Sequence, residues 1–73
     1  MEHRATSDLI RMVAAGAGLD IDATFRPTPD LVRIAAAANS GGGSIRLRGM
    51  AHRPTADLIR IAAAGAGHIT FAD

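Results

Sequence analysis

Apolar and polar residues follow two different rhythms along the chain. Leu31, Ile34, Ala35 and Ala38 are spaced at i, i+3, i+4 and i+7, which places them in one stripe on an α-helix. Alanine, which is abundant in this stretch, has the highest intrinsic helix propensity. The same spacing returns near the start and near the end of the chain. The pattern therefore predicts three helices, each with one apolar face.

A short segment with a period of two follows each predicted helix. The three segments are Leu19-Asp20-Ile21-Asp22, Ile45-Arg46-Leu47-Arg48 and Ile69-Thr70-Phe71. Strict alternation places successive side chains on opposite faces of a β-strand. We therefore predict a strand after each helix, with apolar residues on one face and mainly polar residues on the other.

The predicted helices and strands belong to an internal repeat. The segments RATSDLIRMVAAGAG, RPTPDLVRIAAAANS and RPTADLIRIAAAGAG begin at Arg4, Arg26 and Arg53. Repeats with periods of 20 to 50 residues are typical of stacked supersecondary units. We predict a single domain, residues 1–73, built from three αβ repeats at approximately 4–25, 26–50 and 53–73.

The order αβαβαβ predicts the fold class, which is α/β. Crossovers between parallel strands are almost always right-handed, so consecutive repeats place their helices on the same side of a sheet. We expect a parallel three-stranded sheet in the order 1-2-3 with all helices on one face. This is a short, solenoid-like two-layer sandwich, whose other sheet face is polar and uncovered.

The residues at the helix ends carry further signals. Thr6, Thr28 and Thr55 stand where an N-cap hydroxyl would accept a backbone N–H. Gly16, Asn39 and Gly65 stand where a left-handed residue commonly ends a helix. If the second helix ends at Asn39, residues 39–44 form a long, glycine-rich connection, and we expect it to be the most mobile loop.

Composition limits the ways in which this small domain can be stabilised. The chain has 73 residues, no Cys and two aromatic residues, so neither a disulfide nor a Cys-based zinc site supports its small core. A domain of this size buries only ~60% of its unfolded surface, so we expect oligomerisation, most simply a dimer, to add burial.

The charges and the absence of targeting signals argue against three properties: nucleic-acid binding by charge alone, secretion and membrane insertion. Eight arginines against seven acidic residues leave a net charge of +1, which argues against nucleic-acid binding by charge alone. The start of the chain lacks the pattern of a secretory signal, and no apolar run approaches the ~20 residues that span a membrane. We expect a cytoplasmic protein with no membrane contact, and the arginine-rich, lysine-free usage is typical of a GC-rich bacterial genome.

Three surfaces are candidates for binding. The polar sheet face is a candidate for protein recognition, and cross-strand salt bridges are the alternative explanation of its charges. The last strand presents an edge that is a candidate for self-association. The helix starts bring arginines to one edge, where an anion site is conceivable. The polar sheet face comprises Asp20, Asp22, Arg46, Arg48 and Thr70. The strand edge comprises His68, Ile69 and Phe71, and the arginine edge comprises Arg4, Arg26 and Arg53.

The remaining residues do not form a recognisable catalytic set. No Ser/His/Asp arrangement, Cys nucleophile or close pair of Glu is visible, and His3 and His52 fall two repeats apart, too far to share a metal. We expect no enzyme activity, no cofactor and no metal. The predicted function is that of a self-associating structural or protein-interaction module, and the alternative is binding of an anion or a nucleic acid through the arginine edge or the polar sheet face.

Overall fold

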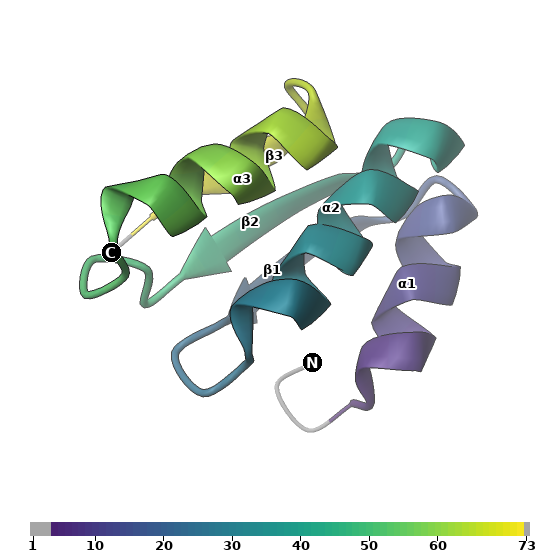
Figure 1. The fold of residues 1–73 in the computed structure, drawn as a ribbon. Helices are drawn as coiled ribbons and strands as arrows, with labels where there is room; N and C mark the ends of the chain where they lie inside the picture. The colour runs from purple at the N-terminus through teal and green to yellow at the C-terminus, as the bar shows by residue number, and fades with distance from the viewer. Residues whose placement is uncertain (1–3, 73) are drawn as a thin grey trace.

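Helices and strands alternate along the whole of the computed structural model, which describes residues 4–72 (Figure 1). The elements are α1 (Thr6–Ala14), β1 (Gly18–Asp22), α2 (Thr28–Gly41), β2 (Ser44–Arg48), α3 (Thr55–Gly65) and β3 (Ile69–Phe71). The predicted α/β class and its alternating order are confirmed. None of the described helices combines the length and the apolar character needed to cross a membrane.

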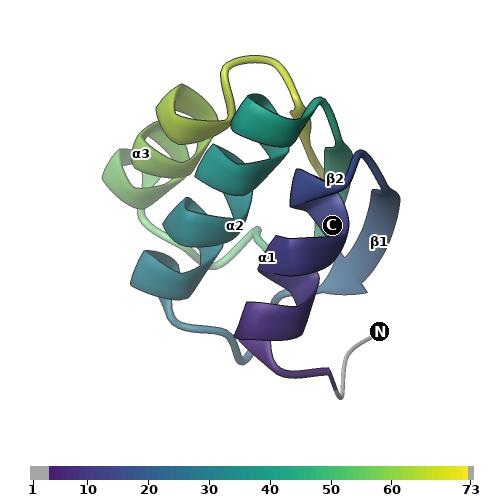
Figure 2. The same ribbon diagram turned by 90° about the vertical axis from the view of Figure 1, so that its right-hand side faces the viewer.

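The strands form one parallel sheet in the order β1-β2-β3. Leu19 pairs with Ile45, which pairs with Ile69, so equivalent residues of the three repeats lie side by side. The three helices lie together on one face of this sheet, and the opposite face is open (Figure 2). The predicted strand order and register are therefore both confirmed.

The core lies between the helix layer and the sheet. Both β1 and β2 alternate exposed and buried residues, and their buried residues face the helices. The middle helix is the most enclosed because it has a neighbour on either side, and four of its residues are buried: Leu31, Ile34, Ala35 and Ala38. These are the four residues whose spacing predicted the helix.

The helices begin one residue earlier than the threonine pattern predicts. The N-cap residues are Ala5, Pro27 and Pro54, and none of them makes a side-chain capping bond. In α2 the Pro27 carbonyl accepts the backbone N–H groups of Asp30 and Leu31, so Thr28 is already helical. The prediction of threonine N-caps was therefore wrong, and the threonine hydroxyls are used in another way, described below.

The connection between α2 and β2 is also different from the prediction. Asn39 and Ser40 continue the helix, which ends when Gly42 adopts a left-handed backbone with φ of 76°. Gly43 is buried, and a side chain there would collide with the backbone carbonyls of Val13 and Ala17. Only two residues separate helix from strand, so the expected long loop is a tight turn packed against the first repeat.

Candidate interaction surfaces

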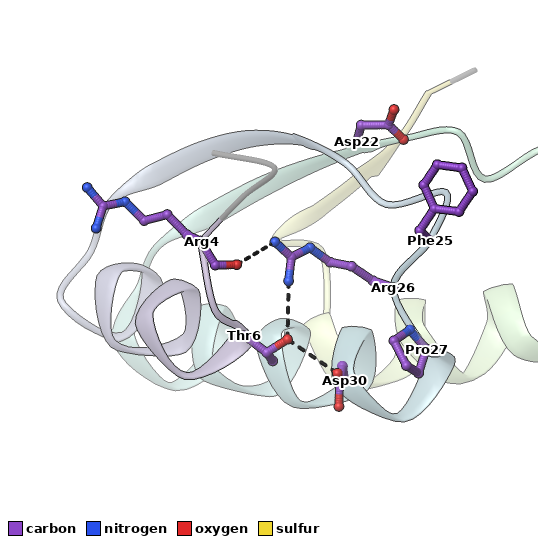
Figure 3. A pocket seen from close by; sticks show the side chains of 7 residues that line it. All are labelled: Arg4, Thr6, Asp22, Phe25, Arg26, Pro27 and Asp30. Carbon is purple, nitrogen blue, oxygen red and sulfur yellow. Dashed lines mark hydrogen bonds between the residues drawn. The ribbon is translucent and has the colours of Figure 1, made fainter.

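A hydrogen-bonded cluster joins the first repeat to the second where their helices begin (Figure 3). Arg26 Nη1 donates to Thr6 Oγ1 at 3.2 Å, and Arg26 Nη2 donates to the Arg4 carbonyl at 2.8 Å. The Thr6 hydroxyl in turn donates to Asp30 Oδ2 at 3.2 Å. A hydroxyl can accept and donate at once, so Thr6 links a guanidinium and a carboxylate of the following repeat.

The same cluster recurs between the second and third repeats. Arg53 Nη1 donates to Thr28 Oγ1 at 2.8 Å, and the Thr28 hydroxyl donates to Asp57 Oδ2 at 3.4 Å. Arg53 Nη2 also donates to the Ala23 carbonyl at 2.7 Å and to the Arg26 carbonyl. We call each cluster an Arg-Thr-Asp clamp: the arginine and aspartate of one repeat hold the threonine of the repeat before it.

The clamps account for the Arg-x-Thr-x-Asp pattern that recurs in the sequence. Sequence reasoning assigned the threonines to helix N-caps and missed their part in the clamps, because Thr before Asp is also the usual signal of a helix N-cap. The available signal was the joint recurrence of arginine, threonine and aspartate at a fixed spacing, since a cap requires the threonine alone. A capping residue is needed once per helix whether or not the helix has neighbours, whereas a clamp requires consecutive repeats.

The predicted anion edge coincides with these clamps. The structure brings Arg4, Arg26 and Arg53 to one edge, but the terminal nitrogens of Arg26 and Arg53 already donate to protein oxygens. An anion there would compete with those acceptors and would also meet the Asp30 and Asp57 carboxylates. Anion binding at this edge stays a prediction.

A shallow hollow of about 500 Å³ lies beside the first clamp (Figure 3). Two arginines and two aspartates contribute to its lining, so their formal charges balance: Arg4, Arg26, Asp22 and Asp30. Phe25 stands at its rim and is 95% exposed. This phenylalanine therefore does not lie in the core of the single chain.

The polar sheet face carries the predicted charges in the predicted rows. Asp20 is the register partner of Arg46, and Asp22 is the partner of Arg48. Arg48 nevertheless reaches diagonally, and its Nε donates to Asp20 Oδ1 at 2.8 Å while Arg46 Nη1 lies 4.0 Å from Asp20 Oδ2. Asp20 therefore binds both arginines, and Thr70 continues its row on β3.

Exposure limits what these ion pairs contribute. The Asp20 side chain is 52% exposed, and an ion pair in such a position contributes about 0–1 kcal/mol. Asp22 has a separate task, because its Oδ1 accepts the Thr24 backbone N–H at 2.9 Å and the Thr24 hydroxyl at 2.5 Å. Salt bridges that join neighbouring strands account for much of this face, and its role in recognition stays a prediction.

The last strand borders a second hollow. His68 Nδ1 lies 2.8 Å from the Gly43 carbonyl, which anchors the start of β3 against β2. Ile69 is half-buried and Phe71 is 38% exposed. Phe71 lines a small hollow of about 140 Å³ together with Met50, Ala51, Leu58 and Ala72. Within residues 4–72, β3 pairs only with β2, so its outer edge is open.

Comparison of the chain with protein-family models, with curated proteins and with solved structures finds no significant match. The part of the chain that the structure describes also holds no group of three His, Asp or Glu side chains arranged to bind a metal ion. His3 lies outside the described residues. The surfaces above are therefore the basis for any statement about function.

Proposed function

We propose that this chain is a small, non-enzymatic repeat protein that serves as a structural or interaction module by associating with other copies of itself. The observation that carries the proposal is the exposure of large apolar side chains in the third repeat. Ile59 is 62% exposed and Phe71 is 38% exposed, and the hollow beside Phe71 reaches inward to the buried Met50.

The size of the domain supports the same proposal. A chain of 73 residues with no Cys has a thin core, and many of its hydrophobic residues are alanines. Apolar burial and conformational entropy nearly cancel at this length, so additional burial between chains stabilises the fold. Open strand edges such as that of β3 also favour pairing with another chain.

The alternative, binding of an anion or a nucleic acid, has less support. The net charge is +1, and the arginines at the helix starts donate to acceptors of the protein itself. The arginines of the sheet face share the Asp20 carboxylate. Neither surface presents a cluster of cations without nearby acids, which strong electrostatic attraction of phosphate groups requires.

Sedimentation equilibrium tests the proposal directly. The chain has no Trp and no Tyr, so concentration is followed by interference optics. We expect the weight-average mass to exceed 7.5 kDa and to rise between low and high micromolar concentration. A mass that stays at 7.5 kDa up to high micromolar concentration would refute self-association.

A further inference from the structure

Each contact between consecutive helices has two sides, and the stack of helices leaves one side uncovered at α1 and the other side uncovered at α3. The forward flank of each helix, which faces the following repeat, loses its cover at α3. Leu9 and Leu31 are fully buried, whereas the equivalent Leu58 is only half-buried. Val13 and Ala35 are likewise fully buried, whereas the equivalent Ala62 is exposed.

The backward flank, which faces the preceding repeat, loses its cover at α1 instead. Ile34 and Ile61 are buried, whereas the equivalent Met12 is only half-buried. A shallow hollow runs along this side of α1 and is lined by Arg4, Asp8, Arg11, Met12 and Ala15. Burial at equivalent positions thus depends on whether a neighbouring repeat is present, and within residues 4–72 each end lacks a different neighbour.

The clamp is divided between the two ends in the same way. Thr6 and Thr28 are half-buried beneath the arginine of the following repeat, whereas Thr55 is exposed and no further repeat follows it among residues 4–72. At the other end Arg4 is exposed, whereas the equivalent Arg26 and Arg53 are half-buried. One end therefore offers the threonine of a clamp, and the other offers the arginine and aspartate.

We propose that two copies of this chain associate head to tail, so that the α1 flank of one copy packs on the α3 flank of the next. Arg4 and Asp8 of one copy then form an Arg-Thr-Asp clamp with Thr55 of its neighbour. The same contact places β1 beside the open edge of β3 and extends the parallel sheet. The inference rests on the proposed self-association and names the surfaces that carry it.

The occupant of these flanks is a second copy because the chain makes the same interface twice within itself. The α1–α2 and α2–α3 contacts are built from equivalent residues and equivalent clamps. Since the two flanks differ, the contact is heterologous, and copies add in one direction to form an open filament or a ring. This mode differs from the dimer expected from the sequence, which stops at two chains.

Two variants block one flank each, and each has a matched control. Ala62→Glu places a charge on the forward flank of α3, and Ala63→Glu places the same charge on the neighbouring residue, whose equivalents Ala14 and Ala36 are exposed in every repeat. Arg4→Glu reverses the charge on the α1 flank, and Arg33→Glu makes the same change at a position whose equivalents are exposed in all three repeats. The first clamp uses the Arg4 carbonyl rather than its side chain, so it survives the Arg4→Glu change.

Sedimentation velocity at high micromolar concentration separates the possible results. We expect the parent chain to form a series of species beyond the dimer, and Ala62→Glu and Arg4→Glu to weaken association by about tenfold or more. The two control variants should behave as the parent chain does. Circular dichroism spectra of the variants check that each one is folded.

Mixing the two blocked variants gives the decisive result. Each blocked variant keeps one intact flank, so an equimolar mixture should form a one-to-one dimer that grows no further. A parent chain that stops at a dimer, or a blocked variant that associates as strongly as its control, would overturn the head-to-tail mode while self-association stands. A parent chain that stays monomeric would overturn both proposals.

Discussion

The second and third repeats carry nearly the same helix, RPTPDLVRIAAAA and RPTADLIRIAAAG, in different surroundings. In α2, which packs against α3 on one side, Leu31 and Ala35 are fully buried. In α3, Leu58 is half-buried and Ala62 is exposed. The comparison shows that, in a stacked fold, the burial of a residue depends on its neighbours in space as well as on its place in the repeat.

The largest expected effect contrasts the two equivalent leucines. Leu31→Ala removes a fully buried side chain and leaves a cavity, so it should lower the free energy of unfolding by about 2–5 kcal/mol. Leu58→Ala should cost about 1 kcal/mol or less, because water already reaches that side chain. Urea denaturation followed by circular dichroism at low micromolar concentration measures both, and equal losses would contradict the comparison.

A second pair of variants compares a formed clamp with an open one. Thr28→Val removes the hydroxyl that links Arg53 to Asp57 and leaves these half-buried groups without that partner, at a cost of about 1–3 kcal/mol. Thr55→Val, at the exposed equivalent position, should change stability by less than about 0.5 kcal/mol. Thermal unfolding of the two variants and the parent chain, at the same low concentration, measures the two losses of stability. A similar loss for both would mean that the clamp is not the source of the loss at Thr28.

The ends of α2 and α3 provide a reciprocal test. Both helices end in a left-handed residue, which is Gly42 in α2 and Ala66 in α3. Gly42→Ala should destabilise the fold by about 1 kcal/mol, and Ala66→Gly should stabilise it by a similar amount, because a side chain is unfavourable in this conformation. Changes of the same sign in urea denaturation would show that backbone conformation does not govern these two positions.

The smallest expected effect lies on the open face of the sheet. Asp20→Asn removes both exposed ion pairs to Arg46 and Arg48 and should cost about 0–1 kcal/mol. The loss should shrink further as salt is added, because salt screens exposed charges. Melting temperatures of the parent and the variant at low and high salt measure this. A loss that stays large in high salt would mean that Asp20 has a role other than these ion pairs.

Much of the architecture could be predicted because its signals are local. The stripe that contains Leu31 and Ile34 and the alternation of Ile45 with Arg46 each span one element, and three copies of the pattern support each assignment. The equivalence of Leu19, Ile45 and Ile69 was enough to predict the register of the sheet. The outlines of the candidate surfaces followed from the same register.

The errors arose where a local signal competed with a contact between repeats. Thr28 has the character of an N-cap, but its hydroxyl bonds across to Arg53 and Asp57 of the next repeat. Asn39 is a common helix terminator, but α2 continues to Gly41 before the left-handed turn at Gly42. The turn that follows brings Gly43 against the backbone of the first repeat, where only a glycine fits.

The sequence by itself determined the repeat, the type and order of its elements, and the face of each that is apolar, since propensity and periodicity act within a few residues of the chain. The tertiary structure decided which copy of each repeated residue is covered, how threonine joins one repeat to the next, and that the two ends of the stack are unlike. These properties depend on the packing of neighbours, and residues that are nearly identical in sequence acquire different surroundings when they stand at the middle or at the end of a stack.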